Sequence, residues 1–236
     1  MTTTNASTTS DRITAQIAVP GARGFDCNTE VTRAQAVRFL EHGYTFAIRY
    51  VGRIRANSYD LAPREVSAIT TAGLGFMIVQ HVQRDGPPWW KPTDDKGKQY
   101  GASAAAQAQT CGYPRGATIW LDLEGIAPRT DREQIIRYAN LWHEAVAAAG
   151  YQPGVYIGSG ARLSAQQLYE RLRFTRYWAA FNLNADEYPI VRGVCMRQLR
   201  AKPPAGVPFQ IDGNVVQEDG LGGLPVLAAV EKPLEG

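Results

Sequence analysis

Short apolar runs alternate with amphipathic segments along most of the chain, and this alternation restricts the possible folds more than any other feature. The apolar runs predict eight strands, at 22–27, 45–51, 75–82, 118–123, 155–158, 177–181, 194–199 and 209–216. Five segments between them have apolar residues at helical spacing, at 32–40, 64–72, 98–110, 131–149 and 164–172. Strands and helices that alternate in this way indicate βα units and a parallel sheet.

Eight predicted strands in a chain of 236 residues fit one closed α/β barrel of the TIM, (β/α)8, type. The polar stretch 1–18 is rich in Thr and Ser, and we expect it to form a disordered N-terminal arm. Residues 19–236 then form the barrel domain. The segments after the sixth and seventh strands are short and rich in proline, so we expect an incomplete ring of helices in the C-terminal third.

Composition excludes several classes of function. The net charge of +3 is mild and no run of Lys or Arg is present, which argues against nucleic-acid binding. No apolar run is long enough to span a membrane, and the N-terminus lacks the apolar core of a signal peptide, so the cellular location is left open. The three cysteines lie far apart without metal-type spacing, and we predict buried thiols and no metal or cofactor.

Four carboxylates fall near the predicted C-terminal strand ends, where the active sites of parallel barrels gather. They are Asp26, Asp122, Glu124 and Asp212. Asp122 and Glu124 are two residues apart on one strand, so both face the same side, roughly 6–7 Å apart at Cα. Close carboxylates repel, which favours a protonated acid beside an ionised one, the pair that glycosidic cleavage requires. The alternatives are a solvated surface pair, a loop cap at Asp26 and a turn residue at Asp212.

Other side chains at the same predicted rim are candidates for binding the substrate. They are Arg49, Gln80, Tyr156, Trp178, Asn182 and Gln198, together with Trp89 and Trp90 in a proline-rich loop after the third strand. The tryptophans could stack on sugar rings or form a hydrophobic clamp. Arg49 could instead neutralise the acidic rim or form a structural ion pair.

The motifs GFDCNT, FAIRYVG, LAPREVSAITTAGLGFMIVQ, TIWLDLEG, GVYIGSG, YWAAFN and QIDGN carry a resemblance to a known family. From about residue 21 to 224 the chain resembles the DUF1906 family, the glycoside-hydrolase-like domain of bacterial and mycobacterial cell-envelope proteins. That family is similar in fold to the family-25 lysozymes (muramidases). The chain departs from the lysozyme pattern at FDCN, where DxS is common, and the arginine of FAIRY is typical of the DUF1906 side.

The resemblance implies a barrel with an acidic site on its C-terminal rim and peptidoglycan, a β-1,4-linked glycan, as substrate. It implies that Glu124 is the general acid and Asp122 its partner, with Asp26 and Asp212 as the remaining site aspartates.

The leading hypothesis is therefore a glycoside hydrolase that acts on cell-wall polysaccharide. Glu124 donates the proton, and Asp122, Asp26 and Asp212 stabilise the developing positive charge. The alternative is a barrel that binds the glycan without cleaving it. A third reading is a hydrolase with an all-oxygen Ca²⁺ or Mg²⁺ site, because only three histidines are present.

Overall fold

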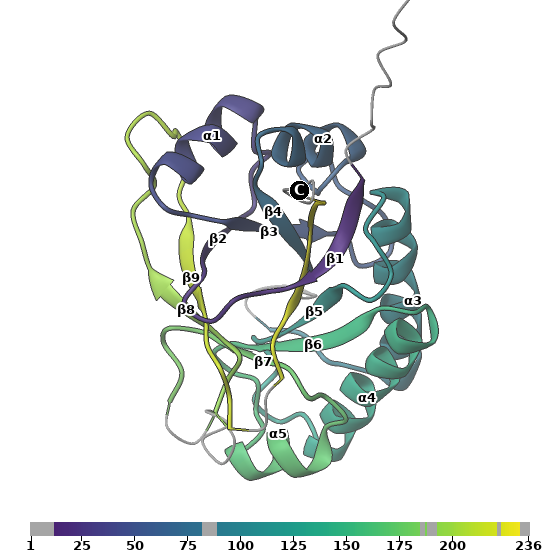
Figure 1. The fold of residues 1–236 in the computed structure, drawn as a ribbon. Helices are drawn as coiled ribbons and strands as arrows, with labels where there is room; N and C mark the ends of the chain where they lie inside the picture. The colour runs from purple at the N-terminus through teal and green to yellow at the C-terminus, as the bar shows by residue number, and fades with distance from the viewer. Residues whose placement is uncertain (1–11, 82–88, 185–186, 188–192, 221–222, 232–236) are drawn as a thin grey trace, which may run out of the picture.

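Eight strands close a ring in the computed structural model, which describes residues 12–81, 89–184, 187, 193–220 and 223–231 (Figure 1). The predicted α/β barrel is thus confirmed. Strands β2 to β9 follow one another around the ring, and β4–β5 and β2–β9 are both paired. Their bounds are β2 Arg23–Cys27, β3 Phe46–Val51, β4 Gly75–Gln80, β5 Thr118–Leu123, β6 Gln152–Ile157, β7 Tyr177–Ala179, β8 Met196–Arg200 and β9 Asp212–Val216.

The helices lie outside this ring and match the five predicted segments (Figure 1). They are α1 Arg33–Glu41, α2 Pro63–Thr71, α3 Asp94–Thr110, α4 Arg132–Ala148 and α5 Ala165–Arg171. The side chains of Thr32 and Ser164 cap α1 and α5, each within a capping box. Helix α3 begins four residues earlier than predicted, because Thr93 Oγ1 accepts a hydrogen bond from Lys96 N and caps it there.

The prediction of a wholly parallel barrel is wrong at β9. Strands β2 to β8 are paired in parallel, whereas β9 runs antiparallel to both β8 and β2. A parallel connection needs a crossover of about a dozen or more residues, usually a helix. Residues 201–211 contain no helix and carry the chain straight back. The expectation of an incomplete ring of helices elsewhere in the C-terminal third stays a prediction.

The N-terminal segment also differs from the expectation of a disordered arm over 1–18. Strand β1, Ile13–Ile17, pairs antiparallel with β10, Val226–Val230, and β10 meets β4 through Ala228 and Phe76. The partner lies more than 200 residues away in sequence, so local composition could not indicate the pairing. Residues 1–11 lie outside the described part of the chain.

Alternation of side chains along the strands divides the apolar residues into two layers. A large cluster between the strands and the helices includes Phe76, Leu121 and Trp142. A smaller cluster inside the ring includes Phe46, Ile48, Met77, Trp120 and Trp178. Glycines make room for its bulky members: a Cβ on Gly154 would lie 2.4 Å from Trp120 Cε3, and one on Gly24 would lie 2.0 Å from Phe46 Cε2. The interior of the barrel is therefore apolar, and the polar side chains of the candidate site lie at the C-terminal ends of the parallel strands.

Candidate functional site

Asp122 and Glu124 line one cleft at the mouth of the barrel. Asp122 lies two residues after the inward-facing Trp120, so strand alternation directs it to the interior, where its side chain is buried. Glu124 follows the end of β5 and lies against Gly158, since a Cβ there would be 2.4 Å from Glu124 Oε2. The glycine after β6 therefore provides the space that the Glu124 carboxylate occupies.

Asp26, at 4% exposure, is the centre of a hydrogen-bond network beside this pair. Its Oδ2 accepts hydrogen bonds from Asn214 Nδ2 at 2.8 Å and from Gln198 Nε2 at 3.1 Å. Its Oδ1 lies 3.4 Å from the Tyr50 hydroxyl. Gln198 Nε2 is also 3.4 Å from Asp212 Oδ2. One amide thus connects two of the predicted site aspartates.

The antiparallel direction of β9 explains how Asp212 reaches this rim. Asp212 is the first residue of β9, not one near its end, and it is paired in register with Asp26. Asn214, two residues on, faces the same side and holds Asp26. Sequence reasoning missed Asn214 and Tyr50, although the two-residue spacing in IDGN and in FAIRY is the signal that would have found them.

Burial raises the pKa of Asp26 to about 7. The hydrogen bonds from Asn214, Gln198 and Tyr50 lower it only in part, and the negative charge of Asp212 raises it further. Burial also raises the pKa of Asp212. Asp26 therefore exchanges its proton near neutral pH, well above the usual range of an aspartate.

The cleft has a volume of about 910 Å³, and its lining exposes polar and apolar surface in nearly equal amounts. Besides Asp122 and Glu124 it is lined by Tyr50, His81, Tyr100, Asn28 and five residues of the segment 53–59. The predicted binding residue Tyr156 is not among the lining residues and instead joins the hydrogen-bond network of Asp26, because its hydroxyl donates to Gln198 Oε1 at 2.9 Å. None of the residues of the segment 53–59 was predicted to line the site.

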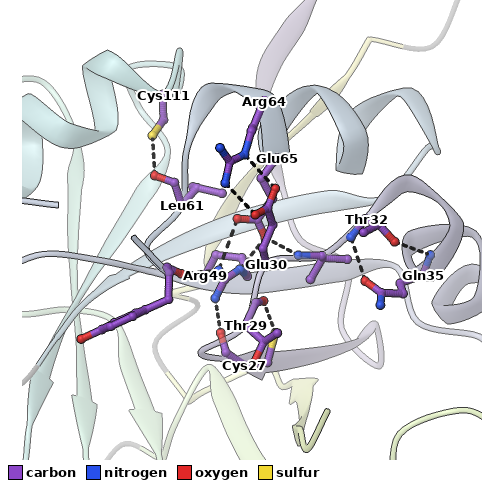
Figure 2. A network of polar contacts seen from close by, with 12 residues as sticks. Cys27, Thr29, Glu30, Thr32, Gln35, Arg49, Leu61, Arg64, Glu65 and Cys111 are labelled. Carbon is purple, nitrogen blue, oxygen red and sulfur yellow. Dashed lines mark hydrogen bonds and ion pairs between the residues drawn. The ribbon is translucent and has the colours of Figure 1, made fainter. Parts of the chain in front are cut away.

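Arg49 is fully buried and points away from the cleft, toward α2 (Figure 2). Its Nε lies 2.6 Å from Glu65 Oε1, and its guanidinium also donates to the carbonyl oxygens of Cys27 and Tyr59. The expectation that Arg49 binds substrate is corrected here, and the structural ion pair is the right alternative. Ile48 and Tyr50 take the inward positions of this strand, which leaves Arg49 on the helix side.

Gln80 is likewise turned toward the helices. Its Nε2 donates to the Tyr100 carbonyl at 2.8 Å, and its Oε1 accepts from Trp142 Nε1 at 2.7 Å. This side chain holds α3 and α4 against β4, so it is not available to a ligand. Asn182, after β7, is exposed and is not among the residues that line the cleft.

The aromatic candidates separate into buried and exposed rings. Trp90 is 1% exposed, donates from Nε1 to the Glu124 carbonyl at 2.7 Å and packs edge-on against Tyr138. It is a structural clamp that fixes the backbone of Glu124. Trp178 is buried inside the barrel, while Trp89 is 47% exposed. Most of the loop before Trp89, residues 82–88, lies outside the described part of the chain.

All three cysteines are buried thiols that form no disulfide, and burial raises the pKa of Cys27 to about 11. A thiol with that pKa is protonated at neutral pH and is a poor nucleophile.

In the described ranges, no group of three or more His, Cys, Asp or Glu side chains is arranged to hold a metal ion. No helix in those ranges is long and apolar enough to cross a membrane.

Comparison with known proteins identifies one family. The model described as the Rv2525c-like, glycoside hydrolase-like domain matches residues 35–192. A search of curated proteins found no match.

Several solved structures share the fold. The Tat-secreted protein Rv2525c of Mycobacterium tuberculosis has a TM-score of 0.59 at 14% identity, over 88% of this chain and 99% of that one. The autolysin LytC of Streptococcus pneumoniae, solved with a synthetic peptidoglycan ligand, has a TM-score of 0.58 at 14% identity, over 83% of this chain and 46% of LytC. The bacterial lysozyme of Streptomyces coelicolor has a TM-score of 0.53 at 13% identity, over 86% and 95%.

Proposed function

Because this chain belongs to the family of Rv2525c-like, glycoside hydrolase-like domains, we propose that it cleaves glycan strands of bacterial peptidoglycan. The observation that carries the proposal is the gathering of Asp26, Asp122, Glu124 and Asp212 at one mouth of the barrel. The fold that the chain shares with a bacterial lysozyme and with LytC supports the same substrate class.

Glu124 is the carboxyl group best placed to donate a proton to the glycosidic oxygen. It is half-buried, lines the cleft, and its backbone carbonyl is held by the indole of Trp90. A general acid must reach the leaving oxygen while its own position stays fixed. The position of Glu124 in the cleft meets the first requirement, and the hydrogen bond from Trp90 meets the second.

Asp122 and the ionised form of Asp26 stabilise the positive charge that develops on the sugar ring during cleavage. Both are buried, where charges act through a lower dielectric than in water. Gln198 and Asn214 hold Asp26 in place through donated hydrogen bonds. Because Asp26 must be ionised and Glu124 protonated, we expect a bell-shaped pH profile of turnover in which the ionisation of Asp26, with a pKa of about 7, sets the acidic limb.

The test is Glu124→Gln, which removes the proton donor and preserves the shape of the side chain. Turnover of peptidoglycan should fall by about 10²–10⁴-fold, while the affinity for the glycan should remain. Glu41→Gln, at the exposed end of α1, is the matched control and should keep full turnover. Equal turnover in Glu124→Gln and the parent would refute this role for Glu124. Binding without any turnover in the parent would favour the non-catalytic barrel.

A further inference from the structure

The segment 52–60, between β3 and α2, forms one wall of the cleft. It contributes Arg53, Ile54, Arg55, Asn57 and Tyr59 to the lining. Ile54 and Tyr59 are 53% and 45% exposed, unusually open for large apolar side chains in this protein. The acid-base roles assigned above use none of these five residues.

Residues outside the wall hold the first half of its backbone. Gln107 donates to the Gly52 carbonyl at 2.7 Å and accepts from the Gly52 amide at 3.0 Å. Gln80 Nε2 donates to the Arg53 carbonyl at 3.2 Å, and Ser103 Oγ donates to the Ile54 carbonyl at 3.1 Å. These three side chains come from β4 and α3, so the wall is attached to the rigid frame of the barrel.

The second half of the wall is held in the same way. The buried Arg49 guanidinium donates to the Tyr59 carbonyl at 2.8 Å. Asp60 Oδ2 accepts a hydrogen bond from the backbone N–H of Asn57 at 2.6 Å, and its Oδ1 lies 2.7 Å from His81 Nε2. The backbone is therefore fixed while the lining side chains face the cleft. A surface fixed before binding loses less conformational entropy when a ligand docks.

Gly52 allows the wall to fold back on itself. A Cβ at this position would lie 1.9 Å from the carbonyl oxygen of Arg55 and 2.7 Å from its carbonyl carbon. Both atoms belong to the backbone, so a side chain could not be accommodated without moving the wall. This contact sets the position of Arg55 relative to the end of β3.

The lining side chains of the wall combine an aromatic surface with a cation. Tyr59 meets the His81 ring edge-on at 5.7 Å, and His81 stacks on Tyr50 at 4.6 Å. Arg55 is exposed, lines the same cleft, and has no hydrogen-bond or ion-pair partner within the described ranges. An aromatic face next to a guanidinium suits a sugar ring that carries an acidic substituent.

We propose that this wall selects carboxylate-bearing glycans: Arg55 binds a carboxylate of the substrate, and Tyr59 packs against the adjacent sugar ring. The inference rests on the proposed function and adds to it the chemical group of the substrate that the cleft recognises, a carboxylate. The carboxylate could belong to the lactyl ether of a muramic residue or to a stem peptide attached to it. A neutral glycan such as chitin would lack this contact.

The test measures binding in the Glu124→Gln background, so that turnover does not consume the ligand. Three probes are titrated by calorimetry: a peptide-free tetrasaccharide with alternating muramic residues, the same sugar with stem peptides, and neutral chitotetraose. Arg55→Gln should weaken at least one carboxylate-bearing probe about tenfold and leave chitotetraose binding unchanged. Weakening of the peptide-free probe identifies the lactyl carboxylate. Weakening of the peptide-bearing probe alone identifies the stem peptide.

Two further variants complete the design. Arg115→Gln, in the exposed connection between α3 and β5 at the opposite end of the barrel, removes the same charge and should change no affinity. Tyr59→Ala should weaken all three probes. If Arg55→Gln weakened chitotetraose binding as much as binding of the carboxylate-bearing probes, or changed no affinity, the role proposed for the wall would be wrong while the proposed function stayed intact. Failure of all three probes to bind would contradict both.

Discussion

Replacing Asp26 with asparagine should stabilise the protein at pH 8 and leave it no more stable at pH 4. The pKa of Asp26 is raised from 3.8 to about 7, chiefly by burial. A raised pKa in the folded state means that the stability from the protonated form is fully present below about pH 4. It is lost as the pH rises through about 7.

The size of the effect follows from the two pKa values. A difference of about three pH units corresponds to about 4 kcal/mol of unfolding free energy lost between pH 4 and pH 8. Asparagine carries no charge at any pH, so Asp26→Asn escapes this loss. Its amide nitrogen adds a donor to a site that already holds donors from Asn214 and Gln198. We therefore expect a net gain of about 1–3 kcal/mol at pH 8.

The assay is urea unfolding of the parent and Asp26→Asn at pH 4, 6 and 8, analysed as the difference between the two proteins at each pH. Asp95→Asn, at an exposed position in α3, is the control and should show no gain in stability at pH 8. The same Asp26→Asn variant should lose turnover. A difference that stays constant with pH, or a variant that is less stable than the parent at pH 8, would refute the reasoning.

Three other substitutions test the supports of the site. Gly158→Ala places a Cβ 2.4 Å from Glu124 Oε2 and should lower turnover about 10²-fold while glycan binding persists; unchanged turnover would contradict the placement of Glu124. Arg49→Met leaves the buried Glu65 without its ion-pair partner and should cost about 3–5 kcal/mol in urea unfolding, and adding Glu65→Leu should recover much of it. Trp90→Phe removes the donor to the Glu124 carbonyl and should cost about 1–2 kcal/mol without lowering glycan affinity, whereas a loss of affinity would make Trp90 a binding residue.

Much of the fold could be predicted because its signals are local. Capping residues such as Thr32 and Ser164 mark helix starts, and the two-residue spacing of Asp122 and Glu124 fixes the face on which they lie. The same spacing rule shows that Arg49 faces outward once Ile48 and Tyr50 are placed inside. The position of Arg49 near the end of its strand suggests a place in the substrate site. That assignment ignores the alternation of side chains along the strand and is wrong.

The features that sequence reasoning missed depend on contacts between distant segments. The direction of β9 follows from a connection without a helix. Residues 13–17 form strand β1 because they pair with a strand at the other end of the chain. The pKa of Asp26 depends on Asn214, which lies 188 residues away. The cleft wall carries no periodic pattern, because its shape comes from Gly52 and from side chains of β4 and α3.

The central claim is that this barrel cleaves glycan strands, and product analysis tests it most directly. The parent protein is incubated with purified peptidoglycan, the products are reduced with borohydride, and the newly reduced sugar ends are counted by mass spectrometry. The account predicts that reduced ends accumulate with the parent and with Glu41→Gln and nearly vanish with Glu124→Gln. Peptidoglycan that is bound by the parent but gains no new reduced ends would contradict it.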